Sequence, residues 1–220
     1  MFTDADRATV TGAVAEAERR TSGEIVPVVA TASENYERAE GLGGIATALA
    51  AVALAWRAFQ DVTAVQGDWA SGWDIRLGLA WILGIFAGGY VLGSLGVRAV
   101  PALKRMLVGR GRMRAEVTRA AAGAFERCHA RGTKSATGVV IYVSLFEHMV
   151  AVLGDRAISE KVTDADWQQV CDTVVRGMRA GRPAEGLAEG IAQCGDLLAK
   201  HFPVDKGDVN ELTNDLRLID

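Results

Sequence analysis

The chain has 220 residues, a hydrophobic fraction of 50% and a formal net charge of −3, with a mean hydropathy of +0.14. This length fits one ordinary domain plus additional chain, and the absence of internal repeats excludes a repeat architecture. Three cysteines, odd in number and without metal-type spacing, fit reduced thiols in a cytosolic domain rather than a disulfide framework.

The first elements are a helix and a strand. Thr3 or Asp4 can cap a helix that ends at Ser22-Gly23 and that places Val10, Val14 and Ala17 on one face. Residues 24–30 (EIVPVVA) then predict a strand, and Pro27 indicates an edge or bulged strand because proline cannot donate to a ladder. Residues 34–40 predict a polar, helical lead-in to an apolar region.

Two apolar runs follow, and both predict transmembrane helices. Residues 77–97 carry no charge, and residues 42–59 carry only Arg57, which is close enough to the end to snorkel to the headgroups. The alternative is a pair of buried helices in a soluble core. Two features suit a membrane hairpin. Tryptophans lie at the ends of the runs, at Trp56, Trp69, Trp73 and Trp81. Small residues also recur four positions apart, at Gly84 with Gly88, Gly89 with Gly93, and Gly44 with Ala48.

Charge around these runs predicts the orientation. Basic residues are concentrated after the second run, whereas the loop between the runs carries Asp61, Asp68 and Asp74 with Arg76 as its only cation. By the positive-inside rule, we expect both termini in the cytoplasm and a multi-pass protein of the inner (cytoplasmic) membrane. Residues 1–20 are charged and amphipathic, so they do not resemble a signal peptide.

Residues 102–131 predict a long helix that is interrupted near Gly109 and Gly111. Its arginines would also suit nucleic acid, but no aromatic residues interleave with them. A basic belt in contact with anionic lipid headgroups is therefore the preferred interpretation, and we expect no nucleic-acid partner. The apolar positions of this helix should face a sheet, and they are Val117, Ala121, Ala124 and Phe125.

The next stretch predicts a β-hairpin and two helices. Residues 138–144 and 149–153 are short apolar runs joined by a turn around Phe146–Glu147, and the second run stops at Gly154-Asp155-Arg156. Thr163-Asp164 opens a helix with an apolar face from Trp167 to Met178, and Pro183 starts a last helix. The inward positions of that last helix are Leu187, Ile191, Cys194 and Leu198.

This order of elements predicts an α/β sandwich with a small mixed sheet, in which residues 24–30 and 138–144 pair in parallel across a crossover that contains the membrane hairpin. The predicted divisions are a discontinuous cytosolic domain of residues 1–40 and 99–200, a transmembrane hairpin of residues 41–98, and a polar tail of residues 201–220.

Three segments of the sequence resemble the TPM-domain family, named after thylakoid, photosystem-repair and acetylcholine-receptor-associated members. They are GEIVPVV at 23–29, TGVVIYVSLFEHMVAVLGDRAISEKVTDADW at 137–167, and the helix at 186–191, and the resemblance covers about two-thirds of the chain. The tail FPVDKGDVNEL resembles a bacterial subgroup with an inserted hairpin. The resemblance implies an α/β/α sandwich, a divalent cation in some members and acid phosphatase activity in a plant member. Many members have a signal peptide and a C-terminal anchor, and we expect neither in this chain.

The resemblance also implies candidate ligands for a divalent cation, calcium or magnesium. Asp155 matches the position after the family's strand-terminal glycine, and Asp164 matches the aspartate of its Thr-Asp helix start. Carboxylate oxygens suit such ions. The alternatives are that Asp155 is a turn residue and that Asp164 is a helix N-cap. Asp166 and Glu160 could complete a site.

Further polar residues suggest weaker chemistry. Arg156 could bind a phosphate or form a surface ion pair of little energetic value. Ser144, Ser159 and Cys128 are available as nucleophiles, but none lies in an elbow motif or beside an evident base. The histidines show no ligand spacing, and they are His129, His148 and His201.

From these observations we expect a membrane-anchored domain that acts as an interaction or assembly module at the inner membrane, with the lipid bilayer and other membrane or membrane-associated proteins as partners. The alternative is a divalent-metal-dependent, phosphatase-like hydrolase that uses Asp155, Asp164 and Arg156. A third option is a structural subunit whose glycine-rich span binds other transmembrane helices.

Overall fold

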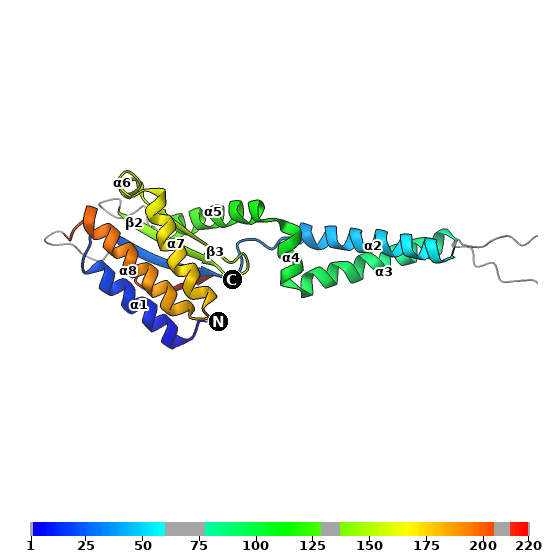
Figure 1. The fold of residues 1–220 in the computed structure, drawn as a ribbon, viewed down its shortest axis with the longest axis horizontal. Helices are drawn as coiled ribbons and strands as arrows, with labels where there is room; N and C mark the ends of the chain where they lie inside the picture. The colour runs from blue at the N-terminus through cyan, green and yellow to red at the C-terminus, as the bar shows by residue number, and fades with distance from the viewer. Residues whose placement is uncertain (1, 60–77, 129–136, 205–211, 220) are drawn as a thin grey trace, which may run out of the picture. The chain divides into compact units, whose positions relative to one another are not determined.

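A computed structural model describes residues 2–59, 78–128, 137–204 and 212–219 of the chain (Figure 1). These residues fall into two compact units, one made of Met1–Glu34 with Gly111–Asp220 and the other of Asn35–Arg110. Several residues discussed above lie outside the described ranges: the charged residues of the loop between the apolar runs, Trp69, Trp73, Leu77, His129 and residues 205–211 of the tail.

The first unit is built on a mixed sheet with the strand order β3-β2-β1-β4. Strand β1 (Glu24–Ala30) runs parallel to β2 (Gly138–Ser144) and to β4 (Arg217–Ile219), whereas β3 (Met149–Gly154) is antiparallel to β2. All seven residues of β1 and all seven of β2 are buried. Such continuous burial is typical of strands covered on both faces, and the predicted parallel pairing is confirmed.

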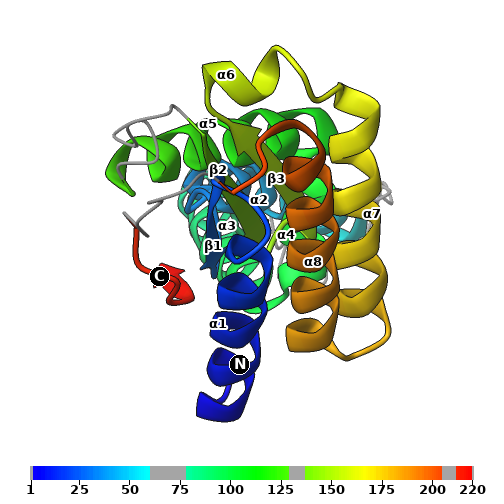
Figure 2. The same cartoon turned by 90° about the vertical axis from the view of Figure 1, so that its left-hand side faces the viewer.

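Three helices cover one face of this sheet, α1 (Asp4–Glu18), α7 (Asp164–Arg179) and α8 (Pro183–His201). Figure 2 shows α8 between α1 and α7, which agrees with its contacts to both. The predicted inward face of α8 is confirmed, because Leu187, Ile191, Cys194 and Leu198 are fully buried. Each leucine or isoleucine side chain removed from water in this way contributes about 1.5–3 kcal/mol.

Helix α5 (Arg110–Arg127) covers the opposite face. Its residues Val117, Ala121, Ala124 and Phe125 pack against β1 and β2, as the sequence predicts. The unit is therefore an α/β/α sandwich with a small mixed sheet, and this part of the predicted fold class is confirmed.

The prediction that β1 is an edge or bulged strand is wrong, because β1 lies between β2 and β4. The register explains how an inner strand accommodates proline. Pro27 is paired with Ile141 of β2, while the pairing with β4 begins only at Val28. Within the described residues, the side of β1 toward β4 has no strand partner at Pro27, so the missing N–H removes no ladder bond there.

Two short elements in the first unit were not predicted. Helix α6 (Arg156–Ser159) follows β3 directly. Strand β4 comes from the end of the chain, and Ile219 accepts a further hydrogen bond from the Thr31 N–H at 2.9 Å. Leu216 is buried in the core under the helices, and Leu212 packs on the α5 face. The tail therefore completes the sheet.

The second unit contains α2 (Glu37–Phe59), α3 (Leu79–Ala99) and α4 (Pro101–Val108). Helices α2 and α3 are long and apolar enough to cross a membrane, judged by length and composition. The polar lead-in becomes helical only at Glu37, after Tyr36 with a φ of 50°. The predicted interruption near Gly109 is confirmed, because this residue has a φ of 77° and separates α4 from α5.

Small residues form the seam between α2 and α3. A Cβ at Gly89 would lie 2.9 Å from the Cα of Ala48, and a Cβ at Gly93 would lie 2.5 Å from the Oγ1 of Thr47. The prediction is therefore right for these two glycines. Gly84 and Gly88 do not belong to the seam, because an added Cβ would have no atom within 4 Å.

Candidate functional site

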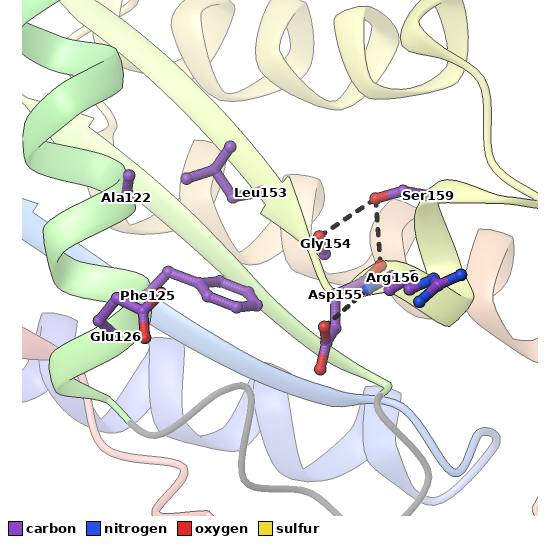
Figure 3. Close-up of a pocket in the computed structure, with 8 residues that line it drawn as sticks. All are labelled: Ala122, Phe125, Glu126, Leu153, Gly154, Asp155, Arg156 and Ser159. Atoms are coloured by element: carbon purple, nitrogen blue, oxygen red, sulfur yellow. Dashed lines mark hydrogen bonds between the residues drawn. The ribbon is translucent and has the colours of Figure 1, made fainter.

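The candidate site is a pocket of about 530 Å³ in the first unit, between α5 and the end of β3 (Figure 3). Ala122, Phe125 and Leu153 supply its apolar lining, and the polar residues around it are Glu126, Asp155, Arg156 and Ser159. Because β3 is antiparallel, this pocket lies at the edge where β2 begins. The Asp155 N–H donates to the Gly138 carbonyl across that edge at 2.9 Å.

Asp155 is the predicted ligand that the pocket contains. Its side chain accepts a hydrogen bond from the Arg156 N–H at 2.7 Å, and it caps the four-residue helix α6. The residue is 9% exposed. Figure 3 shows its carboxylate directed away from the Arg156 guanidinium. Asp155 is therefore a turn residue, as one of the two alternatives predicts. Its carboxylate also lies at the pocket, where the other alternative, a ligand of a cation, would need it.

Asp164 is exposed in the first turn of α7, and it does not belong to the pocket lining. The prediction that it is the N-cap is wrong, because Thr163 is the cap. The Thr163 Oγ1 accepts from the Asp166 N–H at 3.3 Å, and an Asp166 oxygen accepts from the Thr163 N–H at 3.0 Å. The Thr163 side chain and backbone, by donating to this carboxylate, lower the pKa of Asp166.

The metal site on Asp155 and Asp164 stays a prediction. Among the described residues, no group of three or more His, Cys, Asp or Glu side chains could hold a metal ion. Calcium takes six to eight oxygen ligands and magnesium six. The described residues around Asp155 therefore do not by themselves form a complete set of protein ligands.

The other suggested catalytic residues have structural partners. Arg156 is highly exposed and its Nε lies 3.4 Å from Glu160, so the surface ion pair is what the structure shows. The Ser159 hydroxyl donates to the backbone carbonyls of Gly154 and Asp155, at 3.2 and 3.1 Å. The Cys128 thiol is buried, and burial raises its pKa, which leaves it less reactive.

A buried glutamate at the opposite edge of the sheet was missed from the sequence. Glu147, which is 4% exposed, accepts from the Ser144 hydroxyl and, at 2.9 Å, from the Ser33 N–H. Ser144 is also buried, so this serine–glutamate pair has no access to a substrate. It fixes the turn between β2 and β3 instead. A single glutamate in a predicted turn normally indicates solvent exposure, so the sequence carried no signal for this role.

Two carboxylates, Glu18 and Glu24, lie near the start of β1. Glu18 accepts from the Ile25 N–H at 3.0 Å and from the Asn214 side chain at 2.7 Å. Glu24 accepts from the Leu212 N–H at 3.4 Å. Burial, reinforced by the charge of Glu24, raises the pKa of Glu18 to about 7. The pair thus anchors the segment that leads into β4.

Comparison with known proteins supports the same fold. Residues 110–197 match the family model of the TPM domain. The structure is similar to the NMR structure of BA42 protein from the psychrophilic bacterium Bizionia argentinensis, with a TM-score of 0.57 and 19% sequence identity, over 99% of this chain and 95% of that one. A search of curated proteins found no match. The match covers α5, the β2–β3 hairpin, α7 and most of α8, which are the elements that form the pocket and much of the sandwich. Residues 110–197 therefore match the TPM domain, as the resemblance to that family predicts.

Proposed function

We propose that the chain is an inner-membrane protein of the bacterial TPM subgroup with an inserted hairpin. In this proposal α2 and α3 cross the bilayer, both termini lie in the cytoplasm, and the TPM domain acts there as an interaction or assembly module.

The outward surface of the two helices carries this proposal. In the most apolar 18-residue stretch of each helix, only 17% of α2 and 11% of α3 is buried. A core helix of a soluble protein would be mostly buried. Large apolar side chains are exposed along both helices, among them Leu42, Ile45, Leu49, Leu54, Leu83, Val91, Leu92 and Leu95. In water such a surface would be unfavourable, while in lipid it needs no partner.

The ends of the helices support the orientation. Trp56 and Trp81 are exposed near the end of α2 and the start of α3, where an aromatic belt is expected. At the other end, Arg98 lies in the last turn of α3, and Lys104 and Arg105 follow within a few residues. The positive-inside rule places that end in the cytoplasm.

The polar residues of the TPM domain favour binding over catalysis. Among the described residues, the Ser159 hydroxyl is engaged with the backbone and the Ser144–Glu147 pair is buried. The pocket between α5 and β3 combines an apolar lining with a carboxylate, which is a typical composition for a small binding surface.

Reporter fusions test the topology. A cytoplasmic reporter, such as a fluorescent protein, fused after Asp220 should be active, and a periplasmic alkaline phosphatase inserted between residues 60 and 77 should also be active. The same phosphatase fused after Asp220 is the matched control and should be inactive. An active phosphatase at Asp220 would overturn the proposed orientation.

The module itself is tested by crosslinking in intact cells. A photoreactive residue replacing Ala122, an exposed residue of the pocket lining, should give discrete adducts with a membrane or membrane-associated protein, and Asp155→Asn should reduce them. The same residue at Arg179, on the exposed side of α7, is the control. Equal adducts at both positions would contradict a binding surface at the pocket.

The second candidate function is the metal-dependent hydrolase, and the observation that favours it is the position of Asp155 in the pocket. Calcium, magnesium and manganese should then raise the unfolding midpoint of the detergent-purified chain, because a ligand of the native state stabilises it. Asp155→Asn and Asp164→Asn should abolish the rise, and Asp196→Asn, at an exposed site on α8, should not. Turnover of a generic phosphoester lost in Asp155→Asn would favour the hydrolase over the module.

A further inference from the structure

Helix α4 lies across the end of the α2–α3 pair where α2 begins and α3 ends (Figure 1). Val100, with φ −116° and ψ 94°, ends α3 and turns the chain, and Pro101 occupies the first turn of α4. Proline suits this position because its missing N–H is not needed there. The chain therefore changes direction at the end of α3 instead of continuing along the axis of that helix.

An ion pair and an apolar contact hold α4 on α2. The Lys104 Nζ lies 2.9 Å from a carboxylate oxygen of Glu40, and the two side chains are only 16% and 22% exposed. A Cβ at Gly43 would lie 3.5 Å from the Leu107 side chain, so α4 packs closely on this part of α2. These contacts fix which face of α4 points outward, and they neutralise Glu40.

The side of α4 away from α2 carries the apolar side chain of Met106, and the half-buried Arg105 lies next to it in the sequence. Met106 is 73% exposed, and Val100, just before α4, is also exposed. Arg98, at the end of α3, is exposed as well. No residue of α4 is buried. An eight-residue helix has little stability of its own in water, and the contacts with α2 hold one side of it only.

We propose that α4 lies in the headgroup layer of an anionic membrane, with Met106 inserted at the acyl boundary and Arg98 and Arg105 against lipid phosphates. The inference rests on the proposed membrane hairpin, because α3 sets the depth of α4. Charge complementarity selects anionic lipid as the occupant. The position of α4 in the chain also favours a membrane surface, because Val100 alone separates α3 from α4. At a rise of about 1.5 Å per helical residue, α4 begins within a few ångströms of the end of the span.

The experiment uses the full chain reconstituted into vesicles of phosphatidylcholine, or of phosphatidylcholine mixed with phosphatidylglycerol. Met106→Cys carries an environment-sensitive fluorophore, in a background of Cys171→Ala because the other two cysteines are buried. The emission should shift to the blue, and quenching by aqueous iodide should fall several-fold on addition of phosphatidylglycerol. High salt should weaken this dependence on lipid charge.

Charge variants test the recognition of the headgroups. Arg98→Gln with Arg105→Gln should remove most of the phosphatidylglycerol dependence. The matched control, Arg7→Gln with Arg179→Gln, removes two cations from exposed positions of α1 and α7 and should leave it unchanged. Equal emission in both vesicle types, or a loss with the control variant, would overturn the assignment.

A second label separates this inference from the proposed function. Leu92, in the middle of α3, is 70% exposed and would face acyl chains if α3 spans the bilayer. A shielded label at Leu92→Cys with a water-exposed label at Met106→Cys would refute the headgroup position of α4 and leave the membrane hairpin standing. Water-exposed labels at both positions would refute both.

Discussion

The Glu18→Gln variant is predicted to make the stability of the first unit less dependent on pH. In the native chain the pKa of Glu18 is about 7, against 4.5 for an ordinary glutamate, mainly because the side chain is buried. The folded chain therefore binds a proton more tightly than the unfolded chain does. The stabilisation from that proton is complete below about pH 4.5 and is lost as the pH rises through about 7.

The size of the effect follows from the same values. A rise from 4.5 to about 7 corresponds to about 3 kcal/mol. Because Glu18 is only partly buried, water screens part of this energy, and about 1–2 kcal/mol is expected. Glutamine retains an acceptor for the Ile25 N–H, and the Asn214 amide can turn to accept from the new amide. It also removes the repulsion with Glu24.

The assay is thermal unfolding of the detergent-purified chain between about pH 5 and pH 9, the range in which Glu18 titrates. Glu18→Gln should match the native chain at the acidic end and exceed its midpoint by about 2–8 °C at the alkaline end. Glu16→Gln is the control, because Glu16 is an exposed residue of the same helix paired with Arg19. A constant difference between Glu18→Gln and the native chain at all pH values would refute the reasoning.

Three further substitutions, two of them with a glycine control, test the packing, each by chemical or thermal unfolding. Glu147→Ala should lower the free energy of unfolding by about 2–3 kcal/mol, since one buried and one half-buried donor lose their acceptor; an unchanged value would show that the turn is not held by this side chain. Gly177→Ala should destabilise by about 1–3 kcal/mol because its Cβ would meet the backbone of α8. Gly12→Ala, in an open part of α1, should instead stabilise by about 0.5–1 kcal/mol. Gly89→Leu should lower the free energy of unfolding of the α2–α3 pair by about 1–3 kcal/mol, and Gly84→Leu should leave it unchanged. Equal effects of the two substitutions would show that the seam lies elsewhere.

The regular elements of the sandwich could be predicted because their sequence periods are clear. The inward positions of α8 recur at helical spacing, and the run at β2 is uniformly apolar, as burial on both faces requires. The order of the strands could not be predicted from Pro27, because proline excludes a ladder bond on only one side. Whether that side has a partner depends on β4, which is distant in the chain.

The missed features depend on contacts that short patterns do not encode. β4 has three residues, and its polar Arg217 is half-buried while its apolar Leu218 is exposed, so its sequence does not show the usual polar–apolar alternation. The α7 cap was assigned to Asp164 because aspartate and threonine both cap helices, and only the reciprocal bonds between Thr163 and Asp166 decide between them. Asp155 was located at a strand end correctly, but its pocket also needs Phe125 of α5, which the sequence could not bring to it.

The register of β1 constrains the order in which the domain can form during synthesis. This strand pairs on one side with β2 and on the other with β4, so neither partner exists when β1 leaves the ribosome. The hairpin helices α2 and α3 are made before β2, and β4 is made later still. During that interval β1 is an unpaired apolar strand, which is a target for wrong pairing. The nascent chain therefore benefits if α1 covers β1 early, and a chaperone acting on this protein would be expected to bind at Glu24–Ala30.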